Sequence, residues 1–146
     1  MKIYRNSADV LQPSNLKILF WSLLLTLPAK GASWVNAADF GLAKLQPGAD
    51  ATPMLRAAME SCIAGKADGL KIPPGEWHLH PDHAFEQNLA VANNDPGIKR
   101  VVFPIDGFQG FTLAAQGVKF VCHGSMIPIS AENSSNVTLK GFSIDW

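Results

Sequence analysis

The chain has 146 residues, of which 47% are hydrophobic and 16% charged, and its formal net charge at pH 7 is +0. This composition is that of an ordinary globular protein and excludes a disordered or fibrous chain. Without a basic excess or a long charge run, the sequence also argues against a nucleic-acid-binding protein. A neutral sugar is compatible with this charge balance.

Residues 1–37 have the pattern of an export signal. Three basic residues lie before an apolar run over 18–27. A run of about ten residues is too short to span a bilayer, which takes about 20, but it suits the core of a signal peptide. An uncleaved anchor or a buried apolar helix is the structural alternative.

Small residues after the apolar run predict where the signal is removed. We predict cleavage after Ala37, which puts Val35 and Ala37 at the two positions that the peptidase reads. Cleavage after Ser33 is the alternative. Either cleavage releases a periplasmic or extracellular protein with no membrane segment in its mature form.

Residues 38–80 are predicted to form a cap made of a strand, a helix and short strands. The piece 39–42 is expected to be extended, and a helix is expected from Thr52, placed as its N-cap, to Gly65. Apolar residues recur there at helical spacing, so the helix has one face to bury. This stripe consists of Met54, Leu55, Ala58, Met59 and Cys62.

After the helix, the hydrophobic period changes to that of strands, which are expected near 70–72 and 77–80. Residues 81–99 are polar and are predicted to form a long loop excursion, with a strong turn signal over 93–97. A loop of this length in a compact domain is often functional.

The segment 100–146 predicts short strands separated by glycines. They are expected near 100–105, 111–114, 118–122, 126–131, 136–140 and 142–145. Such strands usually indicate a sandwich or a barrel. Here, however, the pair Thr112-Leu113 recurs as Thr138-Leu139, 26 residues later. A period of 20–50 residues is a sign of a repeat architecture, and this spacing suits one coil of a β-helix.

Three features follow one another in the first half: Asp39-Phe40-Gly41, Asp50-Ala51-Thr52 at the helix start, and the turn Ile72–Trp77. Together they resemble the opening of the pectate-lyase-like β-helix proteins. The resemblance implies an all-β fold, a right-handed parallel β-helix whose first coils carry an N-terminal amphipathic capping helix. Such a cap has a physical purpose, because a first coil exposes an apolar cross-section and unpaired strand edges.

The second half is similar to a narrower family. Residues His123–Ile129, Asn136–Trp146 and the polar segment 88–100 resemble the early coils of the α-1,3-galactosidases of glycoside hydrolase family 110. The resemblance implies an exported enzyme that removes terminal α-1,3-linked galactose with inversion, has a glycan as partner and needs no cofactor. Because that family's enzymes have several hundred residues, we expect an N-terminal fragment, with 100–146 as truncated first coils, that is inactive alone.

Inverting hydrolysis needs two carboxyl groups about 6.5–9.5 Å apart. The resemblance implies that the catalytic carboxylates lie beyond Trp146, so the candidates in this chain are substrate-binding residues: Asp145, Trp146 and His123. Asp145 alternates with Ile144 and points outward if Ile144 points inward. Trp146 is suited to stack on a sugar ring. An ordinary exposed acid and a histidine at a strand end are the structural alternatives.

Alternation puts His78 and His80 on one strand face, with His83 nearby, so a metal site is one interpretation. No carboxylate or cysteine completes a ligand set in the sequence, and surface histidines are the favoured interpretation; no metal is predicted. Asp106, which precedes a glycine, is interpreted as a turn residue.

The two cysteines, Cys62 and Cys122, are able to form a disulfide in an exported protein, but two buried free thiols are favoured. Asn133 and Asn136 begin sequences of the N-glycosylation type. We prefer asparagines that bond to the backbone at turns.

Two other functions stay open. One is a non-catalytic β-helix module that binds glycans or only packs; the other is a polygalacturonase-like hydrolase or a lyase on the same scaffold. A lyase normally holds Ca²⁺ between carboxylates, for which the sequence shows no acidic cluster. We also expect 38–146 made alone to aggregate or stay partly unfolded, because its last coil leaves an apolar face and a strand edge exposed.

Overall fold

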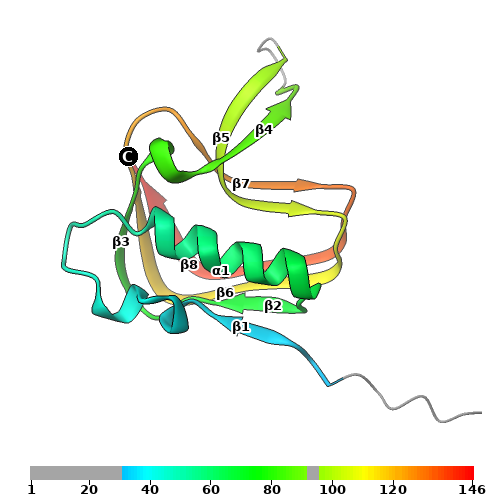
Figure 1. Cartoon of the computed structure of the whole chain (residues 1–146), viewed down its shortest axis with the longest axis horizontal. Helices are drawn as coiled ribbons and strands as arrows, with labels where there is room; N and C mark the ends of the chain where they lie inside the picture. The colour runs from blue at the N-terminus through cyan, green and yellow to red at the C-terminus, as the bar shows by residue number, and fades with distance from the viewer. Residues whose placement is uncertain (1–30, 92–95) are drawn as a thin grey trace, which may run out of the picture. The chain divides into compact units, whose positions relative to one another are not determined.

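The protein is mostly β-structure with one α-helix among the residues that the structure, a computed structural model, describes: 31–91 and 96–146 (Figure 1). This agrees with the predicted all-β class. Residues 32–146 form one unit, and the core of the predicted export signal lies outside the described residues. In chain order, with η for a 3₁₀ helix, the elements are β1 (Trp34–Asn36), η2 (Ala37–Phe40), η3 (Leu42–Lys44), α1 (Thr52–Gly65), β2 (Gly69–Lys71), β3 (Gly75–Leu79), η4 (Pro81–His83), β4 (Phe85–Leu89), β5 (Gly97–Asp106), β6 (Gln109–Cys122), β7 (Ile127–Glu132) and β8 (Ser135–Asp145).

The strands form two sheets, and the chain passes between them repeatedly. One sheet holds β1, β2, β3, β6 and β8, and the other holds β4, β5 and β7. After β3 the chain crosses to β4 and β5, returns as β6, crosses again as β7 and returns as β8. Every strand pair is parallel except β4 with β5. Each return of the chain therefore adds a strand in parallel beside an earlier one.

The 26-residue repeat of the sequence is also the period of this pairing. Thr112 of β6 pairs with Thr138 of β8, and in the other sheet Val101 of β5 pairs with Ile127 of β7. Both partners lie 26 positions further along the chain. Residues that recur at this spacing therefore become neighbours on adjacent strands, and the repeat predicted from Thr112 and Thr138 is confirmed.

A bulge replaces a predicted strand break. The sequence predicts separate strands at 111–114 and 118–122, but β6 runs through both. Its register with β8 shifts between Ala114 and Val118, where Val118 pairs with Phe142. Gly117 has φ +75°, which is in the left-handed region that favours glycine. A bulge here bends the strand while both halves keep their parallel partners.

The first pass of the chain is longer than the second. Gly69 pairs with Thr112 and Gly75 with Val118, so these partners lie 43 positions apart instead of 26. The additional residues fall in the polar segment predicted as a loop over 81–99. In the structure this segment contains η4 and β4, and β4 forms an antiparallel pair with β5. The excursion is therefore partly a β-ladder, which Figure 1 shows projecting beyond β7.

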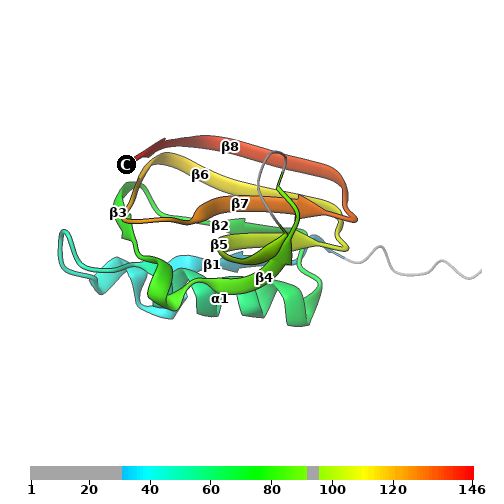
Figure 2. The same ribbon diagram turned by 90° about the horizontal axis from the view of Figure 1, so that it is seen from above.

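Helix α1 covers one end of the stacked strands. Its predicted apolar stripe is confirmed, because Leu55, Met59 and Cys62 are fully buried. The helix contacts β1, β2 and β5, and Figure 2 shows it on the side of the strands opposite to β8. A one-faced helix at this end shields the apolar cross-section that the first strands would expose.

Both ends of helix α1 are capped by other residues than the sequence predicts. Thr52 is the first helical residue and is buried; its hydroxyl accepts a hydrogen bond of 2.8 Å from the His80 amide. The carboxylate of Asp50 accepts from the Thr52 amide at 2.8 Å and so satisfies a donor of the first turn. At the other end, Lys66 rather than Gly65 takes the left-handed conformation.

The start of the described chain also differs from expectation. Residues 39–42, predicted to be extended, instead cover the end of one 3₁₀ helix, η2, the left-handed Gly41, and the start of a second, η3. The extended piece lies earlier, as β1, and pairs in parallel with β2. Within the part of the chain that the structure covers, no helix is long and apolar enough to cross a membrane.

The core lies between the two sheets. Alternate residues of β6 point into it, and Phe111, Phe120 and Cys122 are among those that are buried. β8 is less covered: Leu139 is 44% and Ile144 36% exposed, although Ile144 pairs with the buried Phe120. The inward face of β8 therefore presents apolar side chains that this unit covers only in part.

Candidate functional site

Polar and charged side chains form a row on the outer face of three neighbouring strands. Because side chains alternate along a strand, residues two apart share a face. Glu76 pairs with Lys119 across β3 and β6, and on the far side of β6 Val121 pairs with Asp145 of β8. We call this set the outer row; it comprises Glu76, His78, His80, Lys119, His123 and Asp145.

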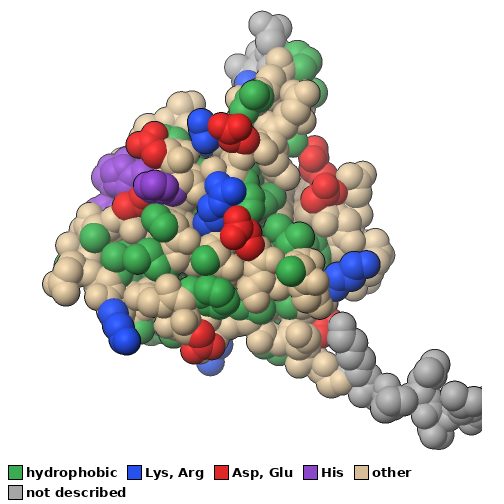
Figure 3. All heavy atoms as spheres, in the orientation of Figure 1, with side chains coloured by type: hydrophobic (Ala, Val, Ile, Leu, Met, Phe, Trp, Pro, Cys, Tyr) green, Lys and Arg blue, Asp and Glu red, His purple; other side chains and the backbone are tan. Residues whose placement is uncertain are grey.

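Three histidine rings stack at one end of the outer row. The ring centroids of His80 and His123 lie 4.5 Å apart, and those of His78 and His123 5.1 Å apart, with interplanar angles of 13° and 16°. Nδ1 of His78 lies 2.8 Å from Nε2 of His123, so one of these nitrogens donates a hydrogen bond to the other. Figure 3 shows histidine side chains gathered at one place on the molecular surface.

The backbone holds His123 in this position. It follows β6 directly, and its amide donates to the carbonyl of Leu79 at 2.8 Å, which extends the β3–β6 ladder by one bond. His78 and His80 are two residues apart around Leu79, whose side chain is buried. Burial of Leu79 therefore fixes both histidines on the outward face.

Lys119 joins two carboxylates at the other end of the row. Its Nζ lies 3.1 Å from Oδ2 of Asp145 and 3.5 Å from Oε2 of Glu76, whose other oxygen lies 3.3 Å from Nε2 of His78. The hydrogen bond from Lys119, a second from the Trp146 amide, and the charge of Lys119 lower the pKa of Asp145. The hydrogen bond to Asp145, together with the negative charges of Asp145 and Glu76, raises the pKa of Lys119.

The lowered pKa has a chemical consequence. A general acid that protonates a glycosidic oxygen needs a carboxyl group with a raised pKa. Asp145 is instead held as a carboxylate, so it is suited to accept hydrogen bonds and not to donate a proton. The stability that it contributes is present above its unfolded pKa and is lost as pH falls through its lower folded pKa.

We expect Lys119→Gln to raise the pKa of Asp145 toward its ordinary value of 3.8, because the main hydrogen bond and the nearest positive charge are lost. The shift is expected to be partial, since the amide of Trp146 still donates to Asp145 at 3.0 Å. NMR titration of the side-chain carboxyl carbon measures it. Lys140→Gln, which removes a charge from β8 outside this ion pair, is the matched control, and an equal shift there would contradict the assignment.

The structure places the three predicted binding residues as follows. His123 and Asp145 share the outer face, where Asp145 pairs with Val121, two residues before His123, and Asp145 points away from the core-facing Ile144 as alternation predicts. Trp146 follows β8 and is 69% exposed. Whether these residues bind a substrate stays a prediction.

Two members of the row, Glu76 and Lys119, were not predicted as site residues. They lie 43 positions apart and become neighbours only through the β3–β6 register. The alternation of Glu76 with His78 and His80 is the one signal in the sequence that places it on that face. His83 lies in η4, and its carbonyl accepts from Arg56 at 3.4 Å.

No group of three or more histidine, cysteine or acidic side chains within 31–91 and 96–146 is arranged to hold a metal ion. Cys62 and Cys122 are buried free thiols. Burial raises the pKa of Cys62 to about 11 and also raises that of Cys122, so both stay protonated and unreactive near neutral pH.

Turn residues connect the successive passes at the other end of the strands. Asn133 is in the left-handed region, and its side-chain Nδ2 donates to the Asp106 carboxylate at 2.9 Å, so the partner is a side chain and not the predicted backbone. Ser134 accepts from the Phe108 amide at 2.9 Å. Asp106 is therefore a turn partner, in line with its interpretation as turn chemistry.

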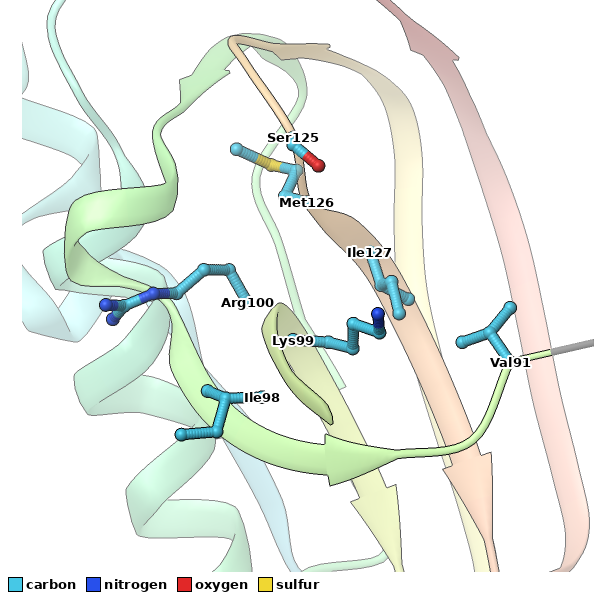
Figure 4. Close-up of a pocket in the computed structure, with 7 residues that line it drawn as sticks. All are labelled: Val91, Ile98, Lys99, Arg100, Ser125, Met126 and Ile127. Atoms are coloured by element: carbon cyan, nitrogen blue, oxygen red, sulfur yellow. The ribbon is translucent and has the colours of Figure 1, made fainter. Parts of the chain in front are cut away.

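A surface pocket of about 350 Å³ lies where β5 runs beside the start of β7 (Figure 4). Its lining combines apolar side chains with two basic ones, and Figure 4 shows Lys99 extending toward Ile127 while Arg100 extends to the other side. Arg100 is paired with Glu86 at 2.7 Å. None of the lining residues belongs to the outer row or is a predicted site residue.

The chain is similar to curated proteins named as α-1,3-galactosidases. It is 38% identical over 112 residues to "Alpha-1,3-galactosidase A" of Shewanella woodyi, a match that covers 77% of this chain and 18% of the relative. It is 33% identical over 137 residues to an "Alpha-1,3-galactosidase B" of Phocaeicola vulgatus, covering 90% and 23%. The corresponding protein of Bacteroides thetaiotaomicron is 30% identical over 130 residues, covering 88% and 21%.

The chain thus spans about a fifth of the length of the curated relatives it matches. No family model matches it.

Proposed function

Because the chain is homologous to part of the α-1,3-galactosidases, we propose that it forms the opening coils of an exported glycosidase that removes terminal α-1,3-linked galactose with inversion. The observation that carries the proposal is the 38% identity over 112 residues to a protein of that name. Since the match covers 18% of that protein, the activity belongs in the proposal to the complete enzyme and not to this chain alone.

The strand pairing supports the proposed scaffold, a right-handed parallel β-helix. The chain alternates between two sheets, and its returns pair in parallel 26 positions apart in both sheets. In such a coil the inner residues build a continuous core, and the outer residues of successive coils line up as rows at strand spacing. The outer row spans two such levels: Glu76 pairs with Lys119, and His78 and Asp145 pair with Val121 from its two sides.

Within this enzyme, we assign substrate binding to one end of the outer row. The exposed ring of Trp146 stacks on the apolar face of a sugar, and the carboxylate of Asp145 accepts hydrogen bonds from sugar hydroxyls. His123 binds hydroxyls farther along the row. The catalytic acid and base belong, in this proposal, to coils that follow β8. The lowered pKa of Asp145 argues against it as the general acid, which requires the opposite shift.

Galactose release by the protein that the complete gene encodes tests the activity. We expect hydrolysis of an α-1,3-linked galactosyl disaccharide, little hydrolysis of the α-1,4- and α-1,6-linked isomers, and β-galactose as the first anomer in a proton NMR time course. The chain 1–146 alone is the matched control and is expected to release no galactose. Degradation of polygalacturonate without galactose release would instead support the pectin-active alternative.

A second candidate is a glycan-binding module without catalysis. The observation in its favour is that Lys119 forms ion pairs with both Glu76 and Asp145, the two carboxylates of the outer row. Paired acids of this kind bind well but are poorly suited to transfer protons. Saturation-transfer NMR of this chain with the same disaccharide distinguishes the two: binding to the chain with no hydrolysis by the complete protein would favour the module.

A further inference from the structure

The extended piece before η2 is an integral strand of the fold. β1 pairs in parallel with β2 along its whole length, from Trp34 with Gly69 to Asn36 with Lys71. Figure 1 shows β1 beside β2 at the edge of the sheet, close to α1. Without β1, the edge of β2 would have unpaired amide and carbonyl groups.

The ring of Trp34 packs directly on Gly69, whose lack of a side chain leaves room for it. A Cβ added at Gly69 would lie 2.6 Å from Cζ3 of Trp34 and 2.6 Å from the carbonyl oxygen of Thr112. The Trp34 ring therefore occupies the place where any other residue at 69 would have its side chain. Removing Trp34 would leave bare backbone at this point of β2.

The residues after Trp34 also make contacts within the folded unit. Val35 packs against the hydrophobic core, and Ala37 is 0% exposed within it. Asn36 caps η2, because its side-chain oxygen accepts from the Ala38 amide at 3.1 Å. A mature protein that began at Ala38 would lack a strand, a cap and a core residue.

We infer that the export signal is removed between Ser33 and Trp34, and not after Ala37. Gly31 and Ser33 are then the two small residues that the peptidase reads. Water adds across the peptide bond, giving the carboxylate of Ser33 and the ammonium group of Trp34. This inference rests on the export that we propose, and it goes beyond it by fixing the first residue of the mature protein.

Asp68 gives the new terminus an electrostatic partner. Its carboxylate accepts from the Ser33 amide at 2.6 Å, and its amide donates to the Ser33 carbonyl at 2.8 Å. Cleavage removes Ser33, and with it both of these hydrogen bonds, and creates a positive charge one residue along, at the start of the strand that pairs with Gly69.

The experiment is to express the full chain with its own leader in a Gram-negative host and to measure the intact mass of the exported protein. We expect the mass of a chain that begins at Trp34. A chain that begins at Ala38, or at any other residue, would overturn the inference. The mass is read without any activity assay, so this result is independent of whether the complete protein hydrolyses galactosides.

Two matched substitutions test the recognised residues. Ser33→Leu puts a large residue directly before the inferred bond, and we expect the uncleaved precursor to accumulate severalfold. Ala32→Leu makes a similar change at the position that the peptidase does not read, and normal processing is expected. Both sites precede β1, and the hydrogen bonds of Ser33 use its backbone, so neither change removes a side-chain contact of the folded unit. Normal processing of Ser33→Leu would contradict the inferred site.

Discussion

Phe120→Ala is expected to lower the free energy of unfolding by about 3–5 kcal/mol, the usual cost of removing a buried aromatic ring from a core. Phe120 is 0% exposed and lies at the middle of three rings. Its centroid is 5.5 Å from that of Phe103 on the opposite sheet and 5.5 Å from that of Phe142 on the next strand. The ring therefore packs between the two sheets and between two successive passes of the chain. Its removal leaves a cavity that the rings of Phe103 and Phe142 border.

Phe142→Ala removes the same side chain from β8, where it is only partly buried, and is the matched control. Its expected cost is clearly smaller, because less apolar area is removed from water. Pulse proteolysis in urea measures both variants at low protein concentration, so that aggregation does not interfere. A loss at Phe120 no larger than that at Phe142 would contradict the placement of Phe120 at the centre of the core.

Two patterns in the sequence predicted elements of the fold correctly: the spacing of apolar residues and a repeat. The apolar stripe of α1 follows from helical spacing, and its members Leu55 and Met59 are buried as predicted. The recurrence of Thr112-Leu113 as Thr138-Leu139 predicted which strands become neighbours, because a coil of constant length brings equivalent positions together. These two signals carry most of the architecture.

Other features could not be predicted from the sequence, because they depend on contacts between residues that are distant along the chain. The sequence predicts an export signal over 1–37, which includes Trp34–Asn36, and the pairing of this segment with β2 depends on residues more than 30 positions away. β4 was predicted as loop because its residues are polar. Its support comes instead from the ladder with β5 and from Arg56, which lies 4.6 Å above the Phe85 ring and donates to the Ala84 carbonyl at 3.0 Å.

The outer row also combines a feature that the local sequence pattern predicts with one that depends on contacts distant in sequence. Alternation alone put His78 and His80 on one face, but the stacking on His123 depends on the register offset of 43 positions. That offset differs from the 26-residue period because of the excursion between β3 and β5. The excursion sets the offset, and the register of β3 with β6 determines which side chains meet. A single-position slip of this register would move Lys119 away from Glu76 and point it into the core.

Gly69→Ala is expected to destabilise the protein by about 1–3 kcal/mol, because the new methyl group overpacks a filled site. It would lie 2.6 Å from the Thr112 carbonyl oxygen, which is backbone, and 2.6 Å from the Trp34 ring. Gly97→Ala on β5 is the matched control, since an added Cβ there has nothing within 4 Å. The control is expected to be neutral or slightly stabilising, because alanine reduces the freedom of the unfolded chain.

The double variant with Trp34→Ala separates the two sources of strain at Gly69. If both neighbours resist the methyl group, removal of the Trp34 ring recovers only part of the loss, because the Thr112 carbonyl oxygen stays in place. Urea midpoints of the four chains of this cycle provide the coupling free energy. Additive effects of the two substitutions would show that Trp34 does not pack on Gly69, and they would also remove one support for a mature protein that begins at Trp34.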